Sequence, residues 1–268
     1  GCFYTLHAIT TIIYDDVAYK NVVSNGLVLD KNGQKMSKRL GNAIDPFTTL
    51  DTYGPDATRW YMISNANPWD NLKFDLDGIA EVRNKFFGTL YNTYSFFVLY
   101  ANLDGFHDQE PEVALENRPE IDRWILSELH SLIEKVDQAY SAYEPTRAAR
   151  LISDFVQEHL SNWFVRLSRR RYWKGAYGPD KISAYQTLYR CLVTVAQLGA
   201  PIAPFFMDRL YRDLTANSGG QWPESVHLTD FPAADKAMID VHLERKMNKA
   251  QTISSLVLSL RQKEKIKV

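Results

Sequence analysis

Two lysines, Lys35 and Lys38, are the residues of this 268-residue chain best suited to chemistry. They lie three positions apart in the polar string Lys35-Met36-Ser37-Lys38-Arg39-Leu40-Gly41-Asn42. Two ammonium groups in an exposed loop can converge on a polyphosphate and stabilise the negative charge that develops when phosphorus is attacked. A solvated basic turn is the alternative, and the charges alone favour it.

The elements around this string predict how it is positioned. Residues 21–29 are rich in β-branched side chains and predict a strand, and Asp30-Lys31-Asn32-Gly33 predicts a turn after it. Pro46 marks the start of a helix, and Gly54-Pro55 separates two short helices between residues 47 and 64. The lysines are therefore expected in a loop between a strand and a helix.

A second group with binding chemistry is the string from Ser161 to Trp173, which joins aromatic rings to arginines at a predicted helix end. Guanidinium groups bind phosphate bidentately and aromatic rings stack on exposed bases, so the string is a candidate RNA-binding site. A solvated helix end with two buried rings is the alternative, and one arginine, Arg166, could instead pair with an internal carboxylate. The candidate RNA contacts are Arg166, Arg169, Arg170 and Arg171.

The chain from Asp77 onward has helical periodicity almost throughout, with short loops between the helices. Amphipathic helices joined by short loops predict an antiparallel bundle. The mainly α fold is thus expected to contain a helical bundle at 77–268, preceded by a truncated α/β remnant at 1–76. Helices are predicted at 76–103, 120–143, 145–174, 179–214 and 236–265, with the fourth kinked by Pro201 and Pro204.

The first fourteen residues also predict a helix, with Phe3, Leu6, Ile9 and Ile13 near helical spacing. No capping residue precedes them, so we expect the chain to begin inside an element of a longer protein.

Composition excludes several classes of protein. The chain carries 31 Lys and Arg against 32 Asp and Glu, so a uniformly basic nucleic-acid coat is excluded although a local basic patch is not. Its two cysteines, Cys2 and Cys191, cannot form a disulfide framework or a cysteine zinc site, which predicts a reducing, cytoplasmic setting. The apolar stretches are too short to predict a membrane span.

The lysine string, with its flanks Asn25–Asp30 and Asn42–Pro46, resembles the KMSKS signature loop of class I aminoacyl-tRNA synthetases, with Arg39 in place of the final serine. The resemblance implies that Lys35, Met36, Ser37 and Lys38 bind ATP. It also implies that Lys35 and Lys38 act catalytically, holding the phosphates while an amino acid carboxylate attacks the α-phosphorus. Mg²⁺ would share the phosphate charge, but no protein ligand for it and no other metal site is predicted.

The signature His-Ile-Gly-His of the same family occurs nowhere in the chain. The opening Gly1-Cys2-Phe3 resembles a Gly-Trp-Phe segment that helps form the amino acid pocket, and Cys2 departs from that pattern. The resemblance therefore implies part of an aminoacyl-tRNA ligase that is inactive by itself.

Three further strings, Ser161–Trp173, Glu224–Pro232 and Met247–Arg261, resemble the anticodon-binding region of this family, and two of them look most like its isoleucyl members. The resemblance implies that 77–268 binds tRNA(Ile), and that the complete enzyme is a cytoplasmic monomer using isoleucine, ATP and Mg²⁺. A valyl or leucyl enzyme is the alternative, as is a tRNA-binding helical module without catalysis. A plain helical scaffold fits less well, because it would need neither the lysine string nor the arginine string in family order.

Overall fold

The fold was determined as a computed structural model that describes residues 1–216 and 222–266. Within these residues the fold is helical except for one small sheet, in agreement with the mainly α prediction. The sheet pairs β1 (Val28–Leu29) with β2 (Leu72–Lys73) in parallel, with Val28 opposite Leu72. Because β2 lies 44 positions beyond β1 in the register, the intervening helices form a crossover on the sheet.

That crossover consists of η1 (Lys38–Leu40), α2 (Pro46–Tyr53) and α3 (Pro55–Asn65). The predicted pair of short helices around Gly54 is thereby confirmed. The Asp45 carboxylate accepts a hydrogen bond from the Thr48 amide at 2.7 Å, and Pro46 occupies the first helical position, where its missing N–H costs nothing.

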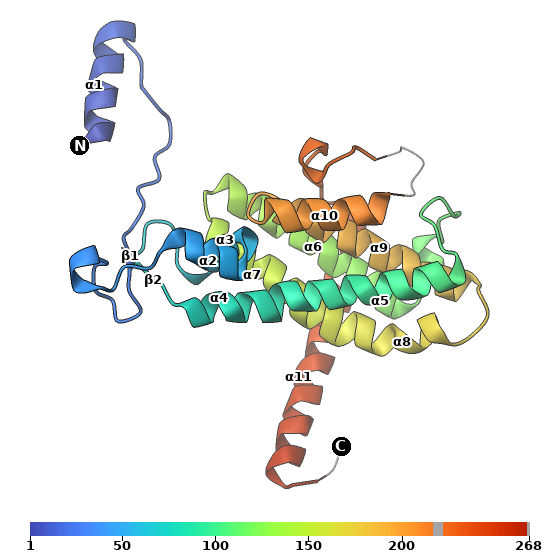
Figure 1. Ribbon diagram of the computed structural model, residues 1–268. Helices are drawn as coiled ribbons and strands as arrows, with labels where there is room; N and C mark the ends of the chain where they lie inside the picture. The colour runs from blue at the N-terminus through green and yellow to red at the C-terminus, as the bar shows by residue number, and fades with distance from the viewer. Residues whose placement is uncertain (217–221, 267–268) are drawn as a thin grey trace.

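Two long helical rods form one side of the bundle (Figure 1). The first joins α4 (Leu76–Val82), a π-helical turn η2 (Arg83–Phe87) and α5 (Gly88–Asp104); the second joins α7 (Pro145–Asp154), the π-helical η4 (Phe155–Val165) and α8 (Arg166–Trp173). The two rods pack against each other where α5 and η2 meet η4. The sequence periodicity predicted both rods as uniform helices, and the π turns are additional.

The remaining bundle helices are α6 (Glu120–Ser141), α9 (Pro179–Gly199) and α10 (Pro204–Thr215). They surround a continuous core in which Trp124, Leu129, Leu188 and Leu192 are fully buried. The predicted single helix at 179–214 is wrong in one respect. Pro204 lacks a backbone donor and begins α10, so the chain breaks between residues 199 and 204 instead of kinking.

The predicted strand at 21–29 is also shorter than expected, since only Val28 and Leu29 pair with β2. Gly26 lies just before β1 and touches the backbone at Asp70, where a β-carbon would come within 2.1 Å of the Asp70 carbonyl oxygen. Close approach of the two backbones thus requires glycine at this position.

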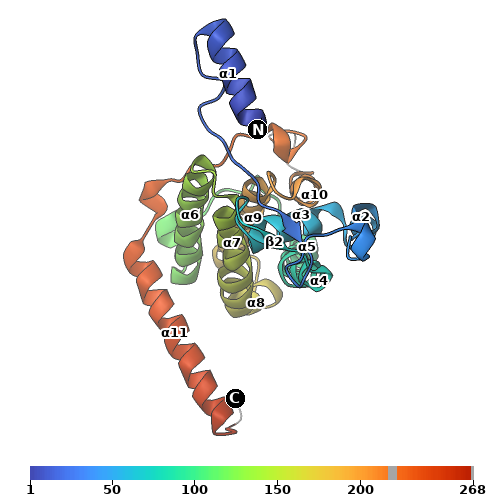
Figure 2. The same ribbon diagram turned by 90° about the vertical axis from the view of Figure 1, so that its left-hand side faces the viewer.

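Two helices project from the body (Figures 1 and 2). Helix α1 (Cys2–Tyr14) contains no buried residue, and α11 (Val241–Lys263) buries Leu243 at its root. Three 3₁₀ turns complete the described elements: η3 (Leu115–Asn117), η5 (Val226–Leu228) and η6 (Lys236–Met238). Among the helices at residues 1–216 and 222–266, we find none with the length and apolar content needed to cross a membrane.

Candidate functional site

The lysine loop leaves β1 and returns to the start of α2. Its first half is held by an antiparallel bridge between Leu29 and Lys35, and its second half forms η1. The hydroxyl of Ser37 accepts a hydrogen bond from the Arg39 amide at 3.2 Å and caps that turn. The side chains of Lys35 and Lys38 are exposed, so both ammonium groups can meet a ligand.

Met36 turns the opposite way from its lysine neighbours. It is partly buried and lines an apolar cavity of ≈ 340 Å³ with Val28, Ile44 and Phe74. Packing of Met36 below the loop explains why the lysines on either side stand on its outer face. Of the four residues predicted to bind ATP, Lys35 and Lys38 therefore present exposed positive charges. Met36 anchors the loop to the apolar cavity below it, and Ser37 caps η1.

Two residues outside the predicted set join the ends of this loop. The Asn42 side-chain amide donates to the Asp30 carboxylate at 2.9 Å. This bond, followed by backbone bonds of which the one from Gln34 is largest, holds the pKa of Asp30 below its ordinary value. Both residues lie in the strings that carry the family resemblance, but the string does not reveal their mutual contact.

The described part of the chain was searched for side chains that could bind Mg²⁺. No group of three or more His, Cys, Asp or Glu side chains in residues 1–216 and 222–266 is arranged to hold a metal ion. We therefore assign no magnesium ligand to these residues and derive no chemical step through the ion.

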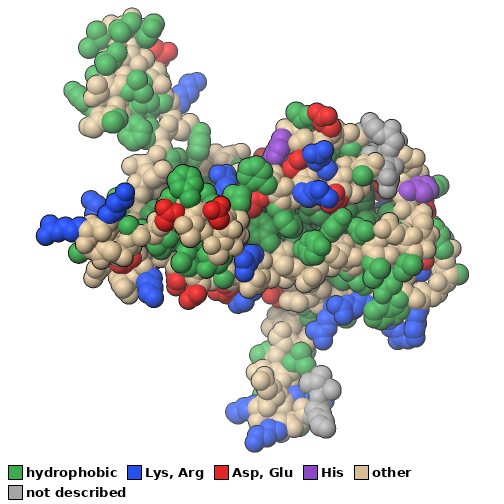
Figure 3. Space-filling view, in the orientation of Figure 1, with side chains coloured by type: hydrophobic (Ala, Val, Ile, Leu, Met, Phe, Trp, Pro, Cys, Tyr) green, Lys and Arg blue, Asp and Glu red, His purple; other side chains and the backbone are tan. Residues whose placement is uncertain are grey.

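The predicted RNA-binding arginines fall into two groups. Arg166, Arg169 and Arg170 are exposed on one face of α8 at helical spacings of three and four, and none has a side-chain partner among the described residues. Trp173 continues the same face one turn later and is 49% exposed. Figure 3 shows Lys and Arg side chains gathered on the surface over α8. The resulting surface, called the α8 face below, combines cations with an accessible indole ring.

Arg171 is directed inward, away from the α8 face. Its guanidinium forms a bidentate pair with Asp122, at 2.6 and 2.9 Å, and it also contacts Asp180. Asp122 is fully buried and accepts a further hydrogen bond from the Ser183 hydroxyl. The structure thus gives Arg171 a packing role between α6, α8 and α9. The internal carboxylate pairing considered for Arg166 occurs at Arg171.

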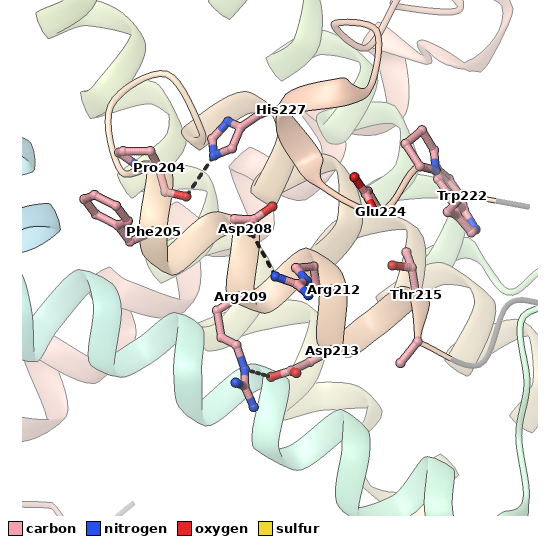
Figure 4. Close-up of a pocket in the computed structure, with 12 residues that line it drawn as sticks. Pro204, Phe205, Asp208, Arg209, Arg212, Asp213, Thr215, Trp222, Glu224 and His227 are labelled. Atoms are coloured by element: carbon pink, nitrogen blue, oxygen red, sulfur yellow. Dashed lines mark hydrogen bonds and ion pairs between the residues drawn. The ribbon is translucent and has the colours of Figure 1, made fainter. Parts of the chain in front are cut away.

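A groove of ≈ 750 Å³ along α10 is a less suitable RNA site, although it contains two exposed arginines (Figure 4). Arg209 pairs with Asp213 at 2.8 Å, and Arg212 lies 3.9 Å from Asp208. His227 contacts the Pro204 carbonyl oxygen at 3.2 Å. Because these charges compensate one another, the groove offers little net attraction for phosphate.

Comparison with protein families gives two ordered matches. Residues 1–75 match the class I tRNA synthetases of the I, L, M and V group, and residues 122–268 match the anticodon-binding domain of tRNA ligases. The chain therefore belongs to the class I tRNA synthetases that carry this anticodon-binding domain.

Its relatives narrow the comparison to one kind of ligase. The chain is 63% identical over 268 residues to the isoleucine–tRNA ligase of Bacteroides thetaiotaomicron, covering all of this chain and 23% of the relative. It is 64% identical to the isoleucine–tRNA ligase of Cytophaga hutchinsonii and 42% identical to that of Thermus thermophilus, covering 24% and 26% of those proteins. The chain thus spans about a quarter of the length of these curated relatives.

A solved structure shows the same fold at low sequence identity. In the crystal structure of the ternary complex of Agrobacterium radiobacter K84 agnB2 LeuRS, tRNA and LeuAMS, the similar region covers 88% of this chain and 27% of that one. The TM-score is 0.67 and the identity is 18%. This similarity supports the arrangement of the helices and carries no residue roles.

Proposed function

We propose that this chain supplies the phosphate-binding signature loop and the tRNA-binding helices of an isoleucine–tRNA ligase. The observation that carries the proposal is the exposed pair Lys35 and Lys38 in the loop after β1, in a chain 63% identical over all its residues to an isoleucine–tRNA ligase. The complete enzyme would use isoleucine, ATP and Mg²⁺, act on tRNA(Ile), and work as a monomer.

In the proposed reaction, the carboxylate of isoleucine attacks the α-phosphorus of ATP and pyrophosphate leaves. A tRNA hydroxyl then takes the isoleucyl group from the resulting adenylate, and AMP is released. The carboxylate is already a nucleophile at neutral pH, so positioning and charge neutralisation are the main demands on the protein. Lys35 and Lys38 meet the second demand, because their exposed ammonium groups can follow the charge onto the departing pyrophosphate.

The α8 face is the proposed contact with tRNA. Arg166, Arg169 and Arg170 are free to bind phosphate, and Trp173 is exposed enough to stack on a base. Arg171 is left out of this contact set, because Asp122 and Asp180 already engage its guanidinium.

A chimera tests the proposal directly. These 268 residues replace the aligned segment of the Bacteroides thetaiotaomicron ligase, and isoleucine-dependent ATP–pyrophosphate exchange is measured. We expect isoleucine-dependent exchange at a rate comparable to that of the parent ligase. A folded chimera that gives no isoleucine-dependent exchange would contradict the proposal.

The chain alone is expected to give no isoleucine-dependent exchange while still binding tRNA(Ile). The sequence contains no His-Ile-Gly-His motif, so Lys35 and Lys38 have no second phosphate-binding segment to work with. Robust exchange by the isolated chain would contradict this division of labour. A chain that is folded but does not bind tRNA would contradict the role of the α8 face.

A further inference from the structure

We propose that Asp30 and Asn42 form a clasp that positions Lys35 and Lys38 by fixing the backbone of the loop, an inference that rests on the proposed nucleotide-binding role of that loop. Neither residue carries a charge that would meet phosphate favourably. Their contribution is made through the loop backbone, which makes them positioning residues.

Asp30 closes the first half of the loop. One carboxylate oxygen, Oδ1, accepts hydrogen bonds from the amides of Asn32 at 3.0 Å and Gln34 at 2.8 Å. The Asp30 amide donates to the Gln34 carbonyl oxygen at 2.9 Å, and the Gly33 amide donates to the Asp30 carbonyl oxygen at 2.9 Å. The turn before Lys35 is therefore built around a single carboxylate.

Asn42 closes the second half. Its side-chain oxygen accepts from the Ser37 amide at 2.8 Å, while its side-chain nitrogen donates to the Lys35 carbonyl oxygen at 3.3 Å. These two backbone groups belong to Lys35 itself and to the residue directly before Lys38. One amide side chain thus sets the position of the main chain at both lysines.

The link between the two halves is the hydrogen bond from Asn42 Nδ2 to Asp30 Oδ2 at 2.9 Å. It is charge-assisted, and such bonds are stronger than those between neutral groups. Asp30 is 9% exposed, and its two carboxylate oxygens are engaged by the Asn32 and Gln34 amides and by Asn42. The lowered pKa of Asp30 agrees with a carboxylate that stays ionised in this setting.

The chain reaches this geometry through Gly41. Its φ of +67° reverses the backbone after η1 and brings Asn42 back to Asp30. A left-handed conformation here is easily adopted by glycine and is strained for most other residues. The loop between the two clasp residues is consequently closed, although its lysine side chains remain exposed.

Hydrogen exchange on the chain itself tests the closure. In Asn42→Ala the Ser37 amide no longer has its acceptor, and in Asp30→Ala the Asn32 and Gln34 amides no longer have theirs. Exchange at these amides is expected to accelerate by about tenfold or more, the change expected when a hydrogen bond to a charged or buried partner is removed. Amides of α6 and α9 should keep their native rates.

Asn32→Ala is the matched control. Asn32 lies in the same loop, but its side chain makes no hydrogen bond within the described residues, and only its amide binds Asp30. This variant should retain native exchange at Gln34 and Ser37. Unchanged exchange in both clasp variants would overturn the proposal.

Positioning is tested in the chimera by separating ATP binding from chemistry. We expect Asn42→Asp, which places a second carboxylate against Asp30, to lower the rate of adenylate formation by about 10- to 100-fold, the scale of a small misplacement of reacting groups. The KM for ATP should change much less. The exchanged pair Asp30→Asn with Asn42→Asp restores one donor and one carboxylate, so part of the rate should return.

The outcomes separate the two proposals. If the parent chimera gives no pyrophosphate exchange, the proposed function fails. Faster amide hydrogen exchange in the clasp variants would still show that the clasp holds the loop. If the parent chimera is active and its Asn42→Asp variant keeps the native adenylation rate, the positioning role is overturned, whatever the hydrogen-exchange rates of the loop amides. An equal loss in Asn42→Asp and in the exchanged pair, with no rescue, would also count against the clasp.

Discussion

Asp30 in the lysine loop and Asp56 at the start of α3 have similarly small exposed fractions, 9% and 7%, but Asp56 is packed more deeply in the protein and the two pKa values move in opposite directions. Hydrogen bonds from Asn42 and from loop amides lower the pKa of Asp30. Desolvation raises the pKa of Asp56, although its carboxylate accepts a hydrogen bond from the Phe206 amide of α10. The loop is organised around a charge that many polar bonds stabilise, whereas the bundle gains its order from apolar packing in which charges are costly.

The same contrast predicts that the largest change in the free energy of unfolding comes from breaking the buried ion pair of Asp122 and Arg171. Asp122→Ala leaves Arg171 largely buried without its bidentate partner, which typically destabilises a protein by about 3–5 kcal/mol. The measurement is the free energy of unfolding in urea. Asp180→Ala removes the 62% exposed partner of the same guanidinium and should cost less than about 1 kcal/mol. Equal losses of stability in the two variants would show that burial does not separate these pairs.

A loop cation should behave in the opposite manner, with a large effect on rate and little on stability. In the chimera, Lys38→Ala is expected to slow single-turnover adenylate formation by about 10²–10³-fold, as when one donor to a developing oxyanion is removed. Isoleucine binding and the unfolding free energy should remain close to native. Arg39→Ala changes the neighbouring exposed cation and is the control. An unchanged adenylation rate in Lys38→Ala would remove that residue from the mechanism.

The arginines of α8 show both kinds of effect: those on the α8 face should affect binding, and Arg171 should affect stability. Replacing Arg169 and Arg170 with alanine should reduce the salt dependence of tRNA(Ile) binding by about one unit for each phosphate that is no longer bound. Circular dichroism and unfolding should stay native, because both side chains are exposed. Arg171→Ala should instead reduce stability, since it leaves Asp122 buried and unpaired. A double variant with native affinity and salt slope would place the RNA contact elsewhere.

The smallest expected effect is a pH dependence at Asp56. A raised folded-state pKa means that the folded protein holds the proton more tightly, so stability falls as pH rises from the ordinary value of 3.8 through the folded value. Asp56→Asn keeps an acceptor for the Phe206 amide and cannot ionise. Its stability relative to the native chain should therefore increase across that window and then level off. Asp51→Asn, at an exposed position of α2, is the control, and an identical curve for both variants would contradict the assignment.

Local patterns in the sequence predicted the elements better than they predicted contacts. Helical periodicity and short loops indicated the bundle, and the lysine string indicated a loop after a strand. The sequence predicted a kink near Pro204 where the structure has a break between α9 and α10. The helical periodicity continues across residues 199–204, so it did not reveal that the chain changes direction there. The partner of Arg171 is 49 positions away in α6, so no local pattern could show that the last of the four arginines turns inward. The clasp was also missed, because Asp30 and Asn42 are 12 residues apart and only the folded loop brings their side chains together.

Helix α11 stands on a narrow polar root. The Glu244 carboxylate accepts hydrogen bonds from the hydroxyls of Ser127 at 2.6 Å and Ser131 at 2.7 Å, both on α6, and the Asp240 amide donates to Ser127 at 2.8 Å. Beyond this root the helix projects from the bundle (Figure 2). From Glu244 to Lys263 the helix continues for about 19 residues rising about 1.5 Å each, so this arm is roughly 28 Å long, and a rotation of about 10° at Glu244 would move its far end by roughly 5 Å. The hydrogen bonds to one turn of α6, together with the ion pair of Lys246 with Glu120 and the buried Leu243, therefore set the direction of the longest α-helix in the described chain.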